Sequence, residues 1–287
     1  MREIINKKYY IEALLTVSNA NPNGDPESGA PRQFSNGHGY ISDVAIKRKI
    51  RNRMEQLGYE ICAKANIGTE KAQSIKTIIW SNPSISKCKD IDEMHNLICD
   101  KYMDARFFGL LVPQKNNGNS KIAENQTAIG IKGPVTCMIV ESVDPIEIEN
   151  MVITKTYNLN KDGPEKASDT FGMTKDFVRF GVYKLCLVIS PYLALKTGFT
   201  NEDFDTLKEI IKTLFQNDES ASRPAGSMNI KNAWYWEVNE QNIDYDGRNV
   251  FDSIVIKKKE GVNYPEYYGD YDIKINNIPG IKIEALI

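Results

Sequence analysis

A glycine-rich loop runs into a strongly basic segment in the stretch GHGYISDVAIKRKIRNRMEQL, residues 37–57. Ser42 or Asp43 stands where a helix N-cap is expected, and Gly58 follows as a stop signal. Apolar residues recur at helical spacing, so the stretch predicts a helix over about 43–57 with one core-facing stripe. That stripe consists of Ile46, Ile50, Met54 and Leu57.

The predicted helix carries five cations within seven positions, and no acid lies between Val44 and Met54. Like charges four residues apart cost a helix a few tenths of a kcal/mol, so selection for stability alone would interleave glutamate. One interpretation is a surface that follows nucleic-acid phosphates. The other is a solvated face balanced by acids from elsewhere in the fold. The cations are Lys47, Arg48, Lys49, Arg51 and Arg53.

The preceding loop, residues 19–41, favours the phosphate interpretation. Its glycines allow close backbone approach to a ligand, and a helix N-terminus presents free N–H groups to an anion. The loop has neither P-loop nor Rossmann glycine spacing, which disfavours a nucleotide hydrolase. Asparagines at 19, 21 and 23 resemble half of an EF-hand loop, but Ala30 occupies the position that needs a bidentate glutamate. No metal or cofactor is expected.

Composition excludes several other classes. The 287 residues contain 36 Lys+Arg and 38 Asp+Glu, so the protein cannot bind a polyanion through net charge, as a histone-like protein does. The five cysteines are scattered and never spaced as C-x-x-C, which indicates free thiols in a reducing compartment. With neither a signal peptide nor an apolar run of about 18 residues, we expect a cytoplasmic protein that does not enter a membrane.

The order of predicted elements indicates an α+β fold of the ferredoxin-like or RRM-like type, βαββαβ. A capping box at Thr200 to Asp203 marks the start of its second helix. The residues between 59 and 103 predict short helices and one strand at about 76–80. Trp234 and Trp236 share one strand face, which favours core or interface packing and leaves base stacking open. The main predicted elements are strands 9–17, 135–143, 177–189 and 232–238 and helices 43–57 and 201–216.

Support for catalysis is thin. The two histidines, His38 and His95, belong to no nucleophile pattern. Asp25 is the one carboxylate in the loop that suits a metal or an acid–base role, and an Asx-type turn is the favoured alternative for it.

The sequence resembles a known family, the backbone subunits of CRISPR Cascade effector complexes in the RAMP superfamily. The type I-C form is most similar, followed by its type I-B relatives. The longest matching stretches are residues 21–26 and 37–52. Shorter matches follow in family order at residues 104–109, 132–135, 177–183 and 222–226.

The resemblance implies a single elaborated domain over residues 1–287, with an RRM-like palm. A helical insertion would occupy about 58–128, and a protruding thumb about 144–175. Copies of the subunit would polymerise along a crRNA, hold its phosphates and present its bases to target DNA. Other Cascade subunits and a recruited helicase-nuclease would be further partners. This role is non-enzymatic; the alternative is a superfamily ribonuclease that cuts bound RNA through Asp25.

The resemblance also implies the RNA-binding residues. From the loop they are Asn21, Asn23, Arg32 and His38, and from the helix start Ser42, Lys47, Arg48 and Arg51. From a second glycine-containing loop they are Arg223 and Ser227. Phe171 and Met173 are apolar residues in the polar excursion, where they would form a thumb contact or fold back onto the core.

Overall fold

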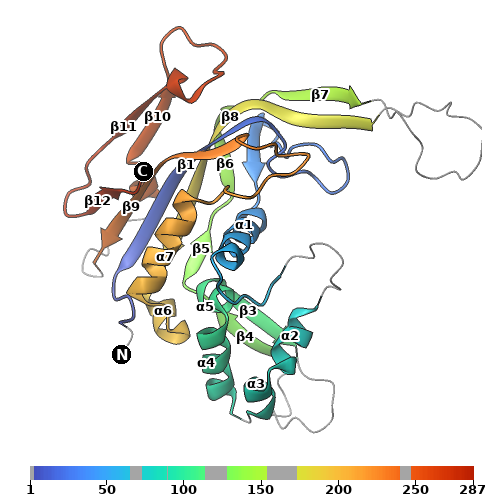
Figure 1. The fold of residues 1–287 in the computed structure, drawn as a ribbon. Helices are drawn as coiled ribbons and strands as arrows, with labels where there is room; N and C mark the ends of the chain where they lie inside the picture. The colour runs from blue at the N-terminus through green and yellow to red at the C-terminus, as the bar shows by residue number, and fades with distance from the viewer. Residues whose placement is uncertain (1–2, 65–72, 89, 114–127, 154–172, 240–246) are drawn as a thin grey trace, which may run out of the picture.

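The fold is built on one large antiparallel sheet, shown in Figure 1. The computed structural model describes residues 3–64, 73–88, 90–113, 128–153, 173–239 and 247–287. The spatial order is β12 (Lys282–Ala285), β9 (Met228–Val238), β1 (Lys8–Ala20), β8 (Met173–Ile189), β6 (Val140–Pro145) and β2 (His38–Ile41). Two further strands, β5 (Val135–Cys137) and β7 (Ile148–Ile153), also pair with β8.

Strand β1 runs through the middle of this sheet. It pairs with β8 from Tyr9 opposite Ile189 to Ala20 opposite Val178, and with β9 on its other side. The strand predicted over 9–17 is therefore confirmed, and it continues for three more residues. Its near-continuous burial has a simple cause, because other elements cover the sheet on both faces.

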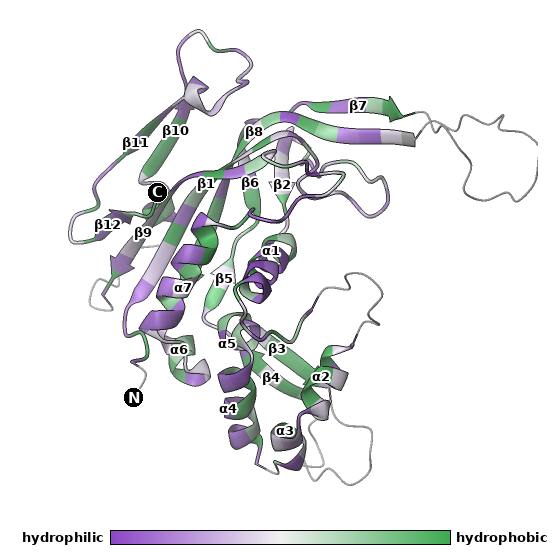
Figure 2. Cartoon of the chain, viewed as in Figure 1, coloured by the Kyte–Doolittle hydropathy of each residue, from purple (hydrophilic) through white to green (hydrophobic). Residues whose placement is uncertain are grey.

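Helices α1 (Asp43–Gln56), α6 (Pro191–Thr197) and α7 (Asn201–Lys212) contribute to the core on one face of the sheet. Figure 2 shows hydrophilic and hydrophobic residues on α7, as an amphipathic helix requires. Ser42 is the N-cap of α1, and the predicted capping box opens α7. The predicted C-terminal ends of α1 and α7 were wrong. Leu57 is 45% exposed beyond the last turn of α1, and α7 ends at Lys212 rather than at 216.

The opposite face of the sheet is covered by the C-terminal segment. The side chains of Trp234 and Trp236 are buried there against Phe251 and Tyr271, so both tryptophans belong to the core. This C-terminal segment, for which the sequence predicted no function, thus completes a second hydrophobic layer. Its elements are α8 (Gly247–Phe251), β10 (Ile254–Lys258), the 3-10 turn η1 (Tyr268–Asp270) and β11 (Tyr271–Ile275).

Residues between α1 and β5 form a smaller helical subdomain with a hydrophobic cluster of its own. Here the strand predicted at about 76–80 was wrong, because Ser74 caps a helix and Ile79 turns into the cluster. The predicted strand 135–143 is divided into β5 and β6, with the exposed Met138 and Ile139 between them. The subdomain contains α2 (Ile75–Ser81), α3 (Pro83–Lys87), α4 (Ile91–Lys101), α5 (Met103–Phe108), β3 (Gly109–Pro113) and β4 (Ala128–Lys132).

Helix α5 fastens this subdomain to the large sheet. The guanidinium of Arg106 donates two hydrogen bonds, of 2.9 and 2.8 Å, to the carboxylate of Asp203 at the start of α7. Immediately after α5, Gly109 has φ of +80° and lies against β4. A Cβ at Gly109 would stand 2.2 Å from the carbonyl oxygen of Ile131, so only glycine fits.

None of the helices in the described ranges is long and apolar enough to span a membrane. All five cysteines lie in those ranges and are free.

We expect Gly109→Ala to lower the free energy of unfolding by more than about 3 kcal/mol, because strained backbone and a backbone clash coincide at this position. Gly58→Ala is the matched control, since Gly58 also has a positive φ but open space around it. The control should cost about 1 kcal/mol. Urea denaturation of both variants measures the difference, and equal losses would contradict the packing argument.

Strand β1 carries a fully buried carboxylate, that of Glu12, on the face covered by the C-terminal segment. The ammonium of Lys184 lies 3.1 Å from it, and Asp252 adds a like charge nearby. Burial is the largest influence and raises the pKa of Glu12 to about 7, despite the opposing effect of Lys184.

Because this pKa is raised, the native protein holds the proton of Glu12 more tightly than the unfolded chain does. The resulting stability is fully present below the unfolded pKa and is lost as pH rises through about 7. We expect Glu12→Gln to reduce the decline of Tm between about pH 5 and about pH 8. Glu149→Gln, at an exposed position, should leave the decline unchanged. Thermal denaturation across this pH range tests both, and an unaltered decline in the Glu12 variant would contradict the assignment.

Candidate nucleic-acid interface

Two loops that are about 200 positions apart in the sequence lie side by side at one end of the sheet. The backbone N–H of Ser18 donates to the carbonyl of Ser227 (2.8 Å), and that of Asn21 donates to Ser222 (2.9 Å). Figure 1 shows the two loops beside the start of α1. The fold thus brings together the loop before α1 and the loop 222–227, which the sequence had singled out separately. The structure extends the second loop back to Asp218.

The first loop is held by its own asparagines. The side-chain amide of the buried Asn21 donates to the carbonyl of Gly29 (2.8 Å). The side-chain oxygen of Asn23 accepts the backbone N–H of Ser42 (2.9 Å), while the Ser42 hydroxyl caps the N–H of Ala45. Asn23 and Ser42 therefore fasten the loop to the first turn of α1 and fix its approach.

Three of the predicted site residues have a buried polar atom without a protein hydrogen-bond partner. These atoms are Oδ1 of Asn21, Nε of Arg32 and Oγ of Ser227. Buried polar atoms are nearly always hydrogen-bonded, so such atoms mark places where water or a ligand completes the bonding. The other described residues with such atoms are Glu12, Asp144 and Tyr183. The three in the loops agree with a polar ligand at this end of the sheet.

Helix α1 reaches the second loop through Asp218. The ammonium of the buried Lys49 makes an ion pair with this carboxylate, which also accepts Nε of Arg223 at 3.3 Å. Burial lowers the pKa of Lys49, and Asp218 opposes that shift. One carboxylate therefore holds two cations together, and the cluster keeps one net positive charge beside the loops.

The other cations of α1 also have protein partners. Arg51 donates to the buried Asp104 (3.1 Å) and lies over the ring of Phe108. Arg48 donates to the carbonyl of Ala63, and burial lowers its pKa. The remaining two pairings are Lys47 with Asp43 at 3.1 Å and Arg53 with Thr213 at 2.9 Å.

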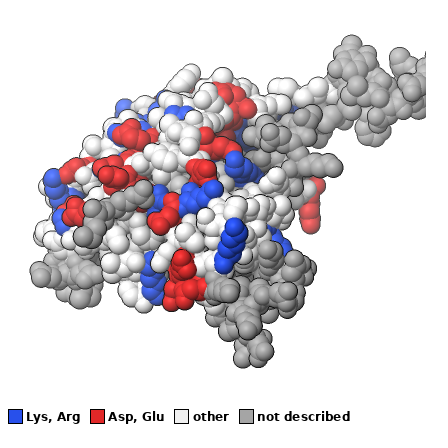
Figure 3. Space-filling view, turned by 60° about the horizontal axis from the view of Figure 1, so that its bottom comes forward, with Lys and Arg blue, Asp and Glu red and all other residues white. Residues whose placement is uncertain are grey.

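Both interpretations of the basic helix are thus partly realised. Carboxylates balance Lys47, Lys49 and Arg51, two of them from distant parts of the chain. Arg48 and Arg53 contact only neutral oxygens, which leaves their charge available to an anion. On the face of the molecule shown in Figure 3, basic and acidic side chains lie next to one another.

The titratable residues of the first loop have local roles. Oδ1 of the exposed Asp25 accepts the backbone N–H groups of Ser28 and Glu27, the Asx-type arrangement, and these bonds lower its pKa. The guanidinium of Arg32 lies 3.6 Å from Asp25. Nδ1 of His38 is 2.7 Å from the carbonyl oxygen of Ser142 on β6. Within the described ranges, no three His, Cys, Asp or Glu residues are placed to hold a metal ion.

Sequence reasoning missed two cations of β8 that border both loops. Lys175 donates to the carbonyl of Ala221, and Arg179 donates to the side chain of Asn19 (3.1 Å). Both lie on one face of the strand, because they are separated by an even number of residues. The alternation of side chains along β8 was therefore the signal that could have predicted both residues. Asp218 carried no signal, since the two acids in this turn, Asp218 and Glu219, form no pattern that a helix or strand would produce.

The excursion predicted at 144–175 begins as a ribbon of β7 paired with the start of β8, which protrudes from the sheet in Figure 1. Met173 is the first residue of β8 and stands opposite Ile153. Phe171 lies outside the described residues.

The family profile described as CRISPR-associated protein Cas7 matches residues 7–276. The chain belongs to the Cas7 family. A curated Cas7 protein of Haloferax volcanii is 20% identical over 223 residues, which cover 74% of this chain and 65% of that protein. The match therefore spans slightly less than two thirds of the relative's length.

Two solved structures match the chain at low sequence identity. A chain of a CRISPR RNA-guided surveillance complex, pre-nicking, has a TM-score of 0.50 and 12% identity, over 80% of this chain and 78% of the other. A chain of a CRISPR RNA-guided surveillance complex has a TM-score of 0.45 and 13% identity, over 80% and 68%. The first likeness supports a common fold with that chain.

For the cluster around Asp218, we expect Asp218→Asn to lower the free energy of unfolding by about 3 kcal/mol, because Lys49 is left buried without a counter-charge. Adding Lys49→Met should restore much of that loss, since the buried charge is then removed as well. Chemical denaturation of the two variants, and of Lys49→Met alone, measures the free energies of unfolding that decide whether the two residues are coupled. Additive losses would show that the pair is not coupled.

Proposed function

We propose that this Cas7-family chain is a non-enzymatic backbone subunit that binds crRNA within a Cascade-type interference complex. One observation carries the proposal. Two polar loops with buried, unpartnered polar atoms meet beside a cationic helix, although they are distant in sequence. Two of these atoms, Nε of Arg32 and Oγ of Ser227, can donate to a phosphate backbone, which needs hydrogen-bond donors and positive charge but no base-specific partner.

Within this proposal, strands β9, β1, β8 and β6 with helices α1 and α7 are the RRM-like palm. Their chain order is βαββαβ, and their spatial order places β1 and β8 in the centre. The insertion at about 58–128 is the helical subdomain, and the β7–β8 ribbon is the base of the thumb. Copies would polymerise along the guide, as in type I-C complexes, and present its bases to target DNA.

The same proposal includes the remaining partners, which are other Cascade subunits and a helicase-nuclease recruited to the assembled complex. The contacts to RNA would come from residues that already have a fixed position. Arg223 is held by Asp218 through Nε, and Arg51 is held by Asp104 in the same way. In each guanidinium the carboxylate takes the Nε–H, so the terminal nitrogens are left as donors for a phosphate.

We expect Arg223→Ala and Arg48→Ala each to weaken crRNA binding equally for all spacer sequences, because phosphate contacts carry no sequence information. Each lost contact should reduce the slope of log K against log salt by about 0.7. Filter binding at several salt concentrations measures both effects. Lys231→Ala, at an exposed position on β9, is the matched control. Losses confined to some spacers would indicate base recognition instead.

The alternative is a ribonuclease that cuts bound RNA and uses Asp25 as a catalytic residue. One observation favours it, because this carboxylate is exposed in the first loop and its lowered pKa keeps it ionised. We expect no cleavage when the purified complex is incubated with complementary RNA and Mg²⁺. Cleavage that disappears in Asp25→Ala, while RNA binding persists, would establish the ribonuclease and replace the scaffold role.

A further inference from the structure

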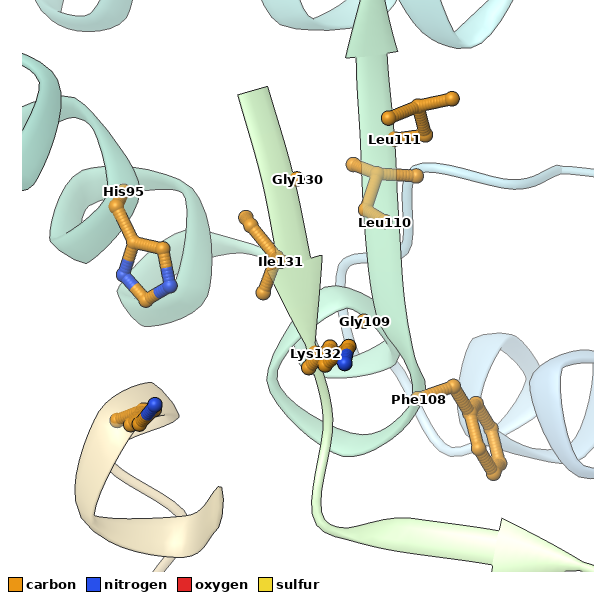
Figure 4. A pocket seen from close by; sticks show the side chains of 9 residues that line it. His95, Phe108, Gly109, Leu110, Leu111, Gly130, Ile131 and Lys132 are labelled. Atoms are coloured by element: carbon orange, nitrogen blue, oxygen red, sulfur yellow. The ribbon is translucent and has the colours of Figure 1, made fainter. Parts of the chain in front are cut away.

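An open groove of about 560 Å³ lies between the helical subdomain and α6, away from the two loops. Figure 4 shows Leu110 and Leu111 on β3, Ile131 on β4 and His95 on α4 around it. Leu111 is exposed although it is large and apolar. Beside the groove, Tyr192 and Leu195 of α6 are exposed as well. Contiguous apolar surface of this kind is typical of a binding site for another molecule.

The charged residues of the groove have one sign. Lys132 and Lys196 line it together with His95, and no Asp or Glu is among its described lining residues. Neither lysine forms an ion pair with a described residue; Lys196 only lies over the ring of Tyr192. The groove therefore fits an occupant that combines apolar or aromatic side chains with carboxylates.

The turn between β10 and β11, residues 259–270, carries three carboxylates, those of Glu260, Glu266 and Asp270, against one ammonium, that of Lys259. Its net charge is therefore opposite to that of the groove. Tyr264 is 83% exposed and Tyr267 is 69% exposed, the two largest exposed fractions among its tyrosines. Glu260 and Glu266 are exposed and form no ion pair with any residue in the described ranges. We call this turn the acidic tip. Tyrosine is favoured in protein interfaces because it gives a large contact area at little entropic cost.

The acidic tip already has a defined conformation. The carboxylate of Asp270 accepts the backbone N–H groups of Glu266 (2.8 Å) and Tyr267 (2.9 Å). Lys259 and Val262 close the first half of the turn through a backbone hydrogen bond of 3.1 Å. A pre-formed turn loses little conformational freedom on binding, so these contacts favour docking without refolding.

The tip and the groove cannot meet within one molecule. In Figure 1 the β10–β11 hairpin is at the top of the view, whereas α4, α6 and the β3–β4 hairpin are at the bottom. Two complementary surfaces at opposite ends of a subunit produce head-to-tail contacts, which join copies into a ring or an open filament. A second copy of the chain therefore supplies both the missing carboxylates and the missing aromatic rings.

We propose that the acidic tip of one copy docks in the groove of the next copy, with Tyr264 and Glu266 against Leu111, Lys132 and Lys196. This interface rests on the proposed function in one respect, because it joins consecutive subunits of the backbone. It is separate from the RNA-binding loops. It also gives the tyrosine-rich C-terminal segment a role beyond covering the sheet.

Charge reversal tests the docking. The groove variant is Lys132→Glu with Lys196→Glu, and the tip variant is Glu260→Lys with Glu266→Lys. We expect each variant alone to lose most of the assemblies larger than one copy that the native chain forms. A mixture of the two should regain them, because every contact in it can then join opposite charges. Mass photometry of full-length, nuclease-treated protein and of protein on long single-stranded RNA measures the sizes.

Combining all four substitutions in one chain should also restore assembly, which a variant that had merely lost its fold could not do. Lys231→Glu controls for the general effect of reversing an exposed lysine. Binding of an RNA too short for two copies should be unchanged in every variant. If that RNA is not bound even by the native chain, the RNA role fails while the docking test in nuclease-treated protein still stands.

Several results would overturn the proposal. One is native-sized assemblies in either single variant, and another is a mixture that stays unassembled. A native chain that remains monomeric with and without RNA would also exclude it. Loss of binding to an acidic protein or to DNA in the groove variant, with self-assembly unchanged, would assign the groove to that ligand instead.

Discussion

The bidentate ion pair between Arg106 and Asp203 is the constraint on which the rest of the structure depends. It joins the helical subdomain to α7 and is buried, so it holds α5 in one orientation. Two residues earlier, Asp104 accepts the backbone N–H groups of Cys62 and Ala63 and the side chain of Arg51. The position of α1 relative to the subdomain therefore follows from the position of α5. Because Arg51 belongs to the candidate RNA-binding surface, a contact that is purely structural also decides where that surface lies.

Buried carboxylates also fix the positions of the cations on α1. Asp104 and Asp218 are both largely buried and hold cations that would otherwise repel one another along the helix. Such pairs contribute little net stability, but they limit the orientations of long side chains. A polyanion then meets arginines that are already oriented, and the cost of ordering them has been met during folding. A chain of near-neutral net charge can in this way present a local phosphate-binding surface.

The C-terminal segment decides which surfaces remain open to a ligand. It covers the face of the sheet that carries Trp234 and Trp236, so neither ring can stack on a base. The proposed RNA site is therefore limited to the loops at the end of the sheet, where Ser18, Asn21 and their partners join the two polar segments. The groove beneath the β3–β4 hairpin and the acidic tip remain exposed at the two ends of the molecule. Burial of one face thus separates the RNA-binding function from the contacts proposed between copies.

By itself the sequence determined the elements whose signals are local. Strand β1, helix α1 with its Ser42 cap, and the capping box of α7 were predicted because periodicity and capping act within a few residues. Tertiary structure alone decided the partner of Lys49, which is 169 positions away, and the meeting of the two loops. It also made residues 76–80 a helix, since a short apolar segment takes the form that best buries Ile79 in its cluster. Long-range ion pairs and burial depend on how elements pack, and no local pattern encodes that packing.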